Sequence, residues 1–490
     1  MSTSTYKRTK IVCTMGPACD DEETIREMIE AGMNIARFNF SHGTYDEQFQ
    51  RIERVRKVSK ELGIPVGIML DTKGPEIRTG YLENHTKVPV TEGDHITVTA
   101  QPTTNDFLGT SEHISLDYVD LPKDIEIGSS ILIDDGLIEL QVERIDGQDM
   151  YCLVKNSGTI DEQKGVNIPN VELGLPAVTD RDKEDIFFGI SMSVDFIAAS
   201  FIRDAEGVNE IRQMLVDNGG ERIAIISKIE CAMAVKNIDE IIEASNGIMV
   251  ARGDLGIELP PELVPHYQKE IIRKCNEAYK PVITATQMLD SMTKNPRPTR
   301  AEVSDVANAI NDGTDAVMLS GETAAGKYPV EAVKMQAAIA IETEKYMPDH
   351  ADLSIQKDAH VTRKINNLVG LSAVAIATEV DAKCITISTD SGRTARLVSH
   401  FRPRTRVVAF SRQEWVVNQM LLYWGVEPFQ ADIVKGTVNG TIVKAVEAAK
   451  QRGIVERGDI TVCIAGDARM TVRRDYKAAS TNVIYVAEAQ

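Results

Sequence analysis

Short apolar runs that end on glycine, small or polar residues recur along the chain. Eight of them occur, at residues 10–17, 34–43, 65–74, 194–202, 222–230, 246–254, 281–289 and 315–323. Segments with helical periodicity separate the runs, and acidic residues precede the helix expected over Thr24–Ala31, where they suit the helix dipole. Eight strand-then-helix units predict an α/β protein built on a closed (β/α)8 TIM barrel. In this architecture the carboxyl ends of the strands form the active site.

The segment between the third and fourth runs has a different pattern. It contains alternating stretches such as DHITVTA and ILIDDGLIELQV, and the pairs Asp135-Gly136 and Asp146-Gly147 are typical of hairpin turns. We therefore expect a small β-barrel domain inserted into a βα loop, placed to close over the mouth of the main barrel as a lid.

The last third of the chain predicts another domain. A helical stretch over Val330–Tyr346 completes the barrel, and a polar segment around residues 348–357 is expected to be a linker. Four further apolar runs alternate with helical patterns and predict a C-terminal α/β domain, at residues 383–389, 405–411, 459–466 and 482–489. The expected division is barrel 1–71, lid 72–171, barrel 172–345 and C-terminal domain 346–490.

Composition and charge exclude several classes of function. The formal net charge of −19 would repel nucleic acid and anionic lipid over most of the surface, so we expect neither partner. No apolar stretch approaches the roughly 20 residues that span a bilayer, and the start of the chain lacks the apolar run of a signal peptide. Seven scattered cysteines without a CxxC pair indicate neither a disulfide framework nor a zinc site, and they favour a cytoplasmic location.

The second apolar run carries a polar face. In ARFNFSHG, strand alternation puts Arg37, Asn39 and Ser41 on one side and two phenylalanines on the other. The run could be a half-buried strand with one solvated side. Alternatively, these polar groups point into the barrel mouth, where the planar fork of Arg37 can clamp a phosphate.

Two neighbouring runs end in carboxylates. Lys228 and Glu230 are two residues apart and hence on the same side of their strand, either as a structural ion pair or with Glu230 holding a divalent cation beside Lys228. The next run supplies Asp254 after Gly253, whose missing side chain lets a ligand approach the backbone. Two carboxylates suit Mg²⁺, which takes its remaining ligands from water and substrate. Thr286 ends the following run and is otherwise an ordinary β-former.

Charged residues follow the third run at the expected hinge of the lid. Asp71 and Thr72 end the run, and Gly74-Pro75 predicts a turn, with Lys73, Glu76 and Arg78 around it. Lys164 lies near the returning connection, where it is either a further cation of the cleft or a solvated surface lysine.

The strings ARFNFSHG, LDTKGPEIRTG, ISKIE, ARGDLG, TATQMLDSM and MLSGETAAG, in this order, resemble the pyruvate kinase family along essentially the whole chain. The resemblance implies transfer of a phosphoryl group from phosphoenolpyruvate to ADP in a homotetramer, with a regulatory C-terminal domain. It implies Mg²⁺ or Mn²⁺ on Glu230 and Asp254, stabilisation of the phosphoryl group and enolate by Lys228, and a phosphate clamp at Arg37.

The resemblance also implies the remaining ligand contacts. The K⁺ ligands would be Asn39, Ser41, Asp71 and Thr72, and Glu76 matches family members that need K⁺. Gly253 and Thr286 are similar to substrate contacts, with Thr286 near the enolate face that gains a proton. The nucleotide would contact Asn39, His42, Arg78 and Lys164. Since phosphoryl transfer needs little covalent work from the protein, catalysis is expected to consist of positioning and neutralisation of charge, with lid closure excluding water.

The C-terminal domain contains a candidate effector loop. Small and polar residues precede a helix whose free N–H groups would favour an anion, namely Ser388, Thr389, Ser391, Gly392, Arg393 and Thr394. The loop resembles the family's sugar-phosphate site, but Asp390 within it would repel a bisphosphate, and the stretch 465–469 lacks the aromatic residue of some relatives. We hypothesise an anionic effector other than fructose 1,6-bisphosphate, or none, with a purely structural cap as the alternative.

Two other functions are alternatives for this chain, an aldolase and a catalytically silent homologue. An aldolase would use Lys228 as a Schiff-base nucleophile, which needs a lowered lysine pKa, whereas Glu230 beside it should keep the lysine protonated. A catalytically silent homologue would be expected to have lost some of five residues, and all five are present, namely Arg37, Lys228, Glu230, Asp254 and Thr286.

Overall fold

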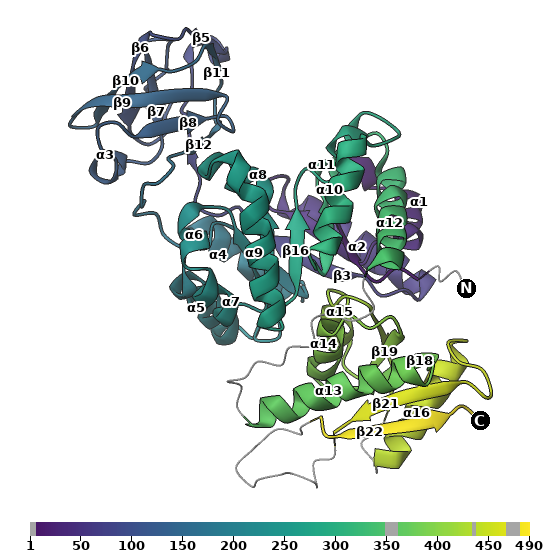
Figure 1. Ribbon diagram of the computed structural model, residues 1–490. Coiled ribbons are helices and arrows are strands. Elements are labelled where there is room, and N and C mark those ends of the chain that lie inside the picture. The colour runs from purple at the N-terminus through teal and green to yellow at the C-terminus, as the bar shows by residue number, and fades with distance from the viewer. Residues whose placement is uncertain (1–5, 348–360, 434–437, 467–480) are drawn as a thin grey trace.

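The computed structural model of the chain describes residues 6–347, 361–433, 438–466 and 481–490. It contains a barrel, a sheet-rich domain inserted into the barrel, and a C-terminal α/β domain (Figure 1). This is the predicted fold class. The exact domain boundaries named above stay predictions, and the expected linker at 348–357 lies outside the described residues.

The eight apolar runs form one closed barrel of parallel strands, as the sequence predicts. The strands are β1 (Lys10–Thr14), β2 (Ile35–Asn39), β3 (Gly67–Asp71), β13 (Phe196–Ala199), β14 (Ala224–Ile229), β15 (Gly247–Ala251), β16 (Val282–Ala285) and β17 (Ala316–Leu319). The barrel closes where β1 pairs with β17, with Lys10 opposite Ala316. Each run is longer than its strand because it also includes the first residues of the following loop or helix.

Helices cover the outside of the barrel. They are α1 (Glu22–Ala31), α2 (Tyr45–Leu62), α4 (Asp180–Ser191), α5 (Ala205–Asp217), α6 (Ala232–Lys236), α7 (Ile238–Ala244), α8 (Arg252–Glu258), α9 (Val264–Glu277), α10 (Arg300–Asn311), α11 (Gly321–Ala324) and α12 (Pro329–Tyr346). The first one begins where predicted to within two residues, because the Asp21 side chain accepts a hydrogen bond from the Thr24 amide and caps it. It ends at Gly32, whose φ of 119° is a conformation that glycine adopts most easily.

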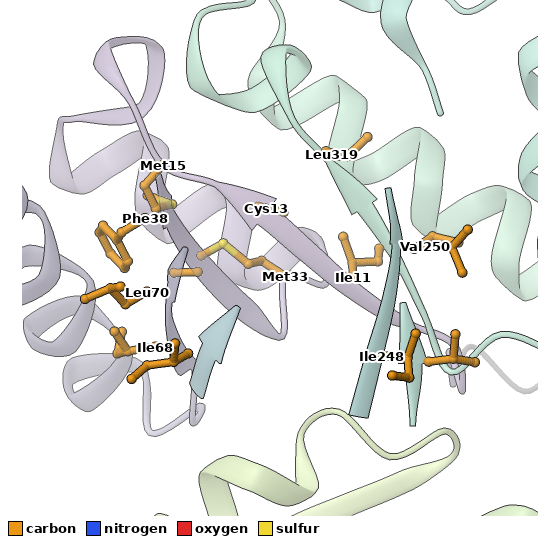
Figure 2. Close-up of a cluster of buried hydrophobic side chains, with 14 of the residues drawn as sticks. Ile11, Cys13, Met15, Met33, Phe38, Ile68, Leu70, Ile248, Val250 and Leu319 are labelled. Carbon is orange, nitrogen blue, oxygen red and sulfur yellow. The ribbon is translucent and has the colours of Figure 1, made fainter. Parts of the chain in front are cut away.

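Strand alternation divides the core into two layers. One set of side chains points outward and packs under the helices, and Figure 2 shows part of it, including Ile11, Phe38 and Leu70. The other set points inward and fills the barrel, including Ile35, Met69 and Ile226. Both sets are almost completely buried, which explains why the strands read as continuous apolar runs. Because side chains on the same face of a strand are two residues apart, the residue two positions after the last inward-facing apolar residue points toward the barrel mouth.

The inserted domain contains a seven-stranded sheet and a separate two-stranded sheet, and it has its own apolar core. Its elements are β4 (Ile77–Arg78), β5 (Val88–Val90), β6 (His95–Ala100), β7 (His113–Leu116), α3 (Leu121–Asp124), β8 (Ser130–Ile133), β9 (Ile138–Asp146), β10 (Asp149–Val154), β11 (Gly158–Ile160) and β12 (Gly165–Asn167). Both predicted hairpins are present, and a bridge between Thr79 and Leu116 joins the two ends of the seven-stranded sheet. In Figure 1 this domain stands off the barrel beside α8, and Asn167 donates a hydrogen bond of 3.0 Å to Glu258 of that helix.

The C-terminal domain is a five-stranded sheet with helices. Its elements are α13 (Val361–Glu379), β18 (Cys384–Ser388), α14 (Arg393–His400), β19 (Arg406–Ser411), α15 (Glu414–Met420), β20 (Val426–Gln430), α16 (Val438–Gln451), β21 (Ile460–Ala465) and β22 (Val483–Glu488). The four predicted strands are present, and the sequence reading missed β20, which lies at an edge of the sheet.

This domain packs against the barrel end opposite the mouth. Leu421 and Leu422 join the inward-facing core of the barrel. Asn418 donates a hydrogen bond of 3.0 Å to the buried carboxylate of Asp195, which precedes β13. Arg402 forms an ion pair of 2.8 Å with Asp315, which precedes β17.

The described helices include none that is long and apolar enough to cross a membrane. All seven cysteines are free thiols.

Candidate active site

Polar groups converge at the carboxyl end of the barrel. Each continues an inward-facing series, so that Val12 is followed by Thr14, Ile35 by Arg37, Met69 by Asp71, Ala198 by Ser200 and Ile226 by Lys228. All five polar side chains are buried, with at most 9% of their residue surface exposed. The alternative of a solvated strand face therefore does not describe Arg37.

The carboxylate of Asp71 lies at the centre of this group. Its Oδ2 accepts a hydrogen bond of 2.6 Å from Arg37 Nε, and its Oδ1 lies 3.1 Å from Lys228 Nζ. Burial alone would raise the pKa of Asp71, but the Arg37 and Lys228 charges outweigh it and the pKa is lowered. Asp71 is therefore a charged anchor that holds the two cations in place.

Lys228 contacts three acceptors. Its ammonium lies 2.7 Å from Ser200 Oγ, 3.1 Å from Asp71 and 2.9 Å from Glu230 Oε1. Burial alone would lower the pKa of Lys228. The negative charges of Asp71 and Glu230 raise it by more than burial lowers it, so the pKa is raised overall. This lysine stays protonated, which opposes a Schiff-base mechanism. The Lys228–Glu230 ion pair is present and lies at the barrel mouth.

Glu230 and Asp254 follow the neighbouring strands β14 and β15. Glu230 comes directly after β14, whereas Asp254 lies in the first turn of α8, because β15 ends at Ala251. Burial raises the pKa of Glu230, Lys228 opposes this rise, and the negative charge of Asp254 adds to it. Burial and then Asp254 also raise the pKa of Asp135, and burial with a smaller effect of Asp254 raises the pKa of Glu258. The negative charge of Asp254 thus contributes to a raised pKa at three carboxyl groups, those of Glu230, Asp135 and Glu258.

This donor set fits a hard divalent cation. The described residues contain no group of three or more His, Cys, Asp or Glu side chains arranged as a complete metal cage. Two carboxylates suit Mg²⁺ or Mn²⁺, which take further oxygen ligands from substrate and water. The cleft between lid and barrel has a volume of about 380 Å³ and is lined by Asp254, Glu258 and Phe201 among others.

The candidate K⁺ ligands lie at the ends of β2 and β3. Asn39 and Asp71 are opposite each other in the register of the two strands, and the Ser41 amide donates to Asn39 Oδ1 at 3.1 Å. The carbonyl oxygen of Thr72 accepts a hydrogen bond of 2.6 Å from Ser200. Each of these residues offers an oxygen atom, which suits a hard monovalent cation.

Gly253 and Thr286 are in direct contact. The Gly253 amide donates a hydrogen bond of 2.8 Å to Thr286 Oγ1, and this hydroxyl donates to the carbonyl of Ala285 at 2.6 Å. Thr286 follows β16 directly and has a φ of 68°, an unusual value for a β-branched residue.

The hinge residues form a separate ionic group. Glu76 pairs with Arg78 at 2.6 Å and with Lys73 at 3.9 Å. The amide of Gly74 donates to Asp182 Oδ1 at 2.9 Å, which ties the outgoing connection of the lid to α4.

The three candidate nucleotide contacts beyond Asn39 are less buried than the barrel cations. Lys164 is on the lid and pairs with Asp134 at 3.0 Å, and Arg78 also donates to the Gln163 carbonyl at 2.8 Å. His42 is exposed on the loop after β2. Within the described part of the chain, His42 contacts neither lid cation.

The candidate effector loop joins β18 to α14. Thr389 Oγ1 accepts hydrogen bonds from the amides of Gly392 at 3.0 Å and Ser391 at 3.4 Å, and Thr394 contacts Thr481 at 2.7 Å. Ser388, at the end of β18, is partly buried, and Arg393 is exposed.

Asp390 is exposed in the middle of this loop, and its Oδ1 lies 3.7 Å from Arg412. Residues 467–469 of the second candidate segment lie outside the described residues.

Sequence reasoning missed three residues of the site. Ser200 contacts Lys228, Asp71 and Thr72, and Thr14 accepts a hydrogen bond of 2.9 Å from Arg37 Nη1. The amide of Phe201 donates to Glu230 Oε2 at 2.6 Å. The signal that could have found the two hydroxyl groups is their position at the ends of the first and fourth apolar runs.

Comparisons with known proteins agree with this architecture. A family model for the pyruvate kinase barrel domain matches residues 6–333, and one for the pyruvate kinase alpha/beta domain matches residues 367–487. The chain is 48% identical to a pyruvate kinase of Geobacillus stearothermophilus over 462 residues, which are 94% of this chain and 78% of that protein. It is 47% identical to a pyruvate kinase of Clostridium acetobutylicum over 460 residues, covering 94% and 96% of the two chains.

Among solved structures, the chain resembles a pyruvate kinase from Cryptosporidium parvum. The TM-score is 0.90 at 38% sequence identity, and the match covers 100% of this chain and 97% of that one.

Proposed function

The chain belongs to the pyruvate kinase family, which transfers the phosphoryl group of phosphoenolpyruvate to ADP, and from this premise we propose the residues that perform the transfer here. One observation carries the assignment. The polar mouth of the barrel places two cationic side chains, Arg37 and Lys228, among three carboxylates, Asp71, Glu230 and Asp254. Such a site is net negative and cannot attract a phosphorylated carboxylic acid without bound cations.

We propose that Glu230 and Asp254 hold Mg²⁺ or Mn²⁺. When bound, this ion supplies positive charge to the oxygen atoms of the substrate and to the charge that develops during transfer. Lys228 then no longer has to neutralise Glu230 alone, and one of its N–H groups can turn to an oxygen of the transferred phosphoryl group.

Arg37 is the proposed clamp for the substrate phosphate. Asp71 fixes its Nε and Thr14 its Nη1, whereas Nη2 makes no hydrogen bond within the described part of the chain. A guanidinium that is rigidly held with a donor still open is suited to a phosphate oxygen.

In the transfer step, the bond between phosphorus and the enol oxygen of phosphoenolpyruvate breaks, and a bond from phosphorus to a terminal oxygen of ADP forms. The charge left on the enolate lies beside Lys228. Protonation of its methylene carbon gives pyruvate, and Thr286 and Gly253 are proposed to line that side of the substrate.

Asn39, Ser41, Asp71 and Thr72 are the proposed K⁺ ligands. Glu76 would support this dependence by balancing the charges of the nearby Arg78 and Lys73.

Asn39, His42, Arg78 and Lys164 are the proposed nucleotide contacts. Two of them are on the lid, so lid closure would bring cations to the ADP phosphates and exclude water.

The assembly and setting are also proposals. We infer a homotetramer, which the exposed edge strand β22 supports, because Tyr485 and Val486 are each 47% exposed on it. The seven free thiols support a cytoplasmic location. Asp390 in the loop before α14 supports an anionic effector other than fructose 1,6-bisphosphate, or none, and strong activation by micromolar amounts of that sugar would contradict this.

The central test is Lys228→Met in a coupled assay for pyruvate formation. We expect kcat to fall by about 10²–10³, the range found for loss of one well-placed charge donor. Binding of Mn²⁺ and phosphoenolpyruvate, measured by titration calorimetry, should persist. Near-normal turnover would refute the role of Lys228.

The K⁺ proposal is tested by replacing K⁺ with Na⁺ in the same assay. A steep loss of activity is expected for the wild type, and little effect would overturn the role given to Glu76. Lys183→Met is a suitable control for both tests, because this lysine pairs with Asp180 on the surface of α4.

A further inference from the structure

The backbone is strained where β16 ends. Thr286 and Gln287 follow one another with φ values of 68° and 53°, in the left-handed region that side chains other than glycine's disfavour. The cost is greatest for a β-branched residue such as threonine. Two such residues in sequence persist only when their surroundings impose the conformation.

The guanidinium of Arg252 binds the backbone on both sides of Thr286. Its Nε donates to the carbonyl of Ala285 at 3.2 Å, and its Nη2 donates to the carbonyl of Thr286 at 2.7 Å. These two carbonyl groups lie on either side of the Thr286 α-carbon. A planar fork that holds both of them restricts both backbone dihedral angles of Thr286 at once.

Arg252 is itself firmly held. Its Nη1 donates to Asp305 Oδ1 at 2.7 Å and to Gln268 Oε1 at 3.3 Å, and its side chain is 11% exposed. The anchors come from α10 and α9, the helices that flank the strand end. The fork therefore cannot turn away from the two carbonyl groups without breaking an ion pair.

We propose that Arg252 is a positioning residue that clamps the strained turn at Thr286 and so fixes its hydroxyl against the Gly253 amide. The clamp, this amide and the carboxylate of Asp254 belong to three consecutive residues. The turn and the proposed metal ligand are thereby held at one fixed separation. The inference rests on the proposed function, in which Thr286 and Asp254 face the substrate.

Arg252 could instead be only a link between α8, α9 and α10. Arg252→Lys separates the two roles, because a lysine keeps the charge opposite Asp305 but its single ammonium cannot hold both carbonyl groups in a plane. For a clamp, we expect kcat for pyruvate formation to fall at least about tenfold while KM for phosphoenolpyruvate changes less than about threefold. Arg273→Lys is the matched control, since Arg273 is exposed on α9 and, among the residues that the structure describes, pairs only with Glu277 one turn away.

A second substitution makes the test specific for strain. Glycine adopts a positive φ without steric cost, so Gln287→Gly removes part of the strain that the clamp must hold. We expect the loss caused by Arg252→Lys to shrink to less than about threefold in the Gln287→Gly background. A purely structural link predicts the same loss in both backgrounds.

Equal effects in the two backgrounds, or unchanged kcat in Arg252→Lys, overturn the clamp. If Arg252→Lys does not fold, Asp305→Asn weakens the anchor of the guanidinium, and the same rescue by Gln287→Gly is expected. The proposed function is tested separately by whether the wild type forms pyruvate at all. The clamp is tested by the ratios of kcat between the variants and their parent backgrounds.

Discussion

Replacing the central carboxylate of the site, by Asp71→Asn, should lower both stability and activity. The substitution keeps the size of the side chain and removes the charge that Arg37 and Lys228 share at 2.6 and 3.1 Å. Asp71 is 1% exposed, so water cannot replace it. Removing one partner of a buried ion pair costs about 3–5 kcal/mol because the other charge is left uncompensated.

The expected change in melting temperature follows from this energy. For an unfolding unit of roughly 250 residues, about 2 °C per kcal/mol is a cautious conversion, which gives a decrease in Tm of about 6–10 °C. Differential scanning fluorimetry at a fixed scan rate measures it. We expect kcat to fall about 100-fold as well, because both cations lose their common anchor.

The pH dependence gives an independent check. Since the folded-state pKa of Asp71 is lowered, its contribution is fully present above the unfolded pKa of about 3.9 and is lost only as pH falls through the still lower folded value. The difference in Tm between wild type and Asp71→Asn should therefore stay constant from pH 5 to pH 8.

Asp180→Asn is the control for this substitution. Asp180 pairs with Lys183 at 2.8 Å, but its side chain is 97% exposed, so Tm should change by less than about 1 °C. A decrease of less than about 2 °C in Asp71→Asn, with normal turnover, would refute the assignment of Asp71 as the buried anchor.

Three further predictions concern other positions. Ser200→Ala should lower kcat about tenfold, since it removes one of the three acceptors of the Lys228 ammonium, with KM for ADP unchanged in steady-state kinetics. Gly74→Ala should lower Tm and kcat together, because Gly74 has a φ of 74° and a new Cβ would lie 2.8 Å from atoms of Phe201 and Ser200. Burial raises the pKa of Asp195 to about 7, so its stabilising effect is lost as pH rises from about 4 to about 7, and Asp195→Asn should flatten the decrease of Tm with pH in that window.

The barrel could be predicted from the sequence because its strands are buried on both faces. Residues such as Ile225 and Ile226 face opposite layers and are both apolar, so each strand gives an unbroken run. The strand β20 could not be predicted in this way. Its sequence contains Pro428 and two polar residues, which a central strand would not tolerate but an edge strand does.

The charged residues of the candidate site could be predicted from the sequence, but the contacts between them could not. Lys228 and Glu230 stand out because charge at the end of a buried strand is rare. The bridge from Asp71 to Lys228 has no counterpart in the sequence, since β3 and β14 are separated by β13 in the barrel and by more than 150 positions in the chain. The role of Ser200 could not be predicted from the sequence for a related reason. A serine after an apolar strand is common, and only closure of the barrel brings Ser200 to Lys228.

The insertion of the lid leaves the barrel seam intact. Although the lid interrupts the chain between β3 and β13, these strands still pair in register, with Asp71 opposite Ala198, and the Thr72 amide still bonds to the Ala198 carbonyl at 3.0 Å. The pairing of β3 with β13 therefore does not require a short connection between the two strands. We infer that a module inserted at this point can be exchanged, lengthened or deleted without loss of the barrel, which makes this junction a place for grafting a foreign domain.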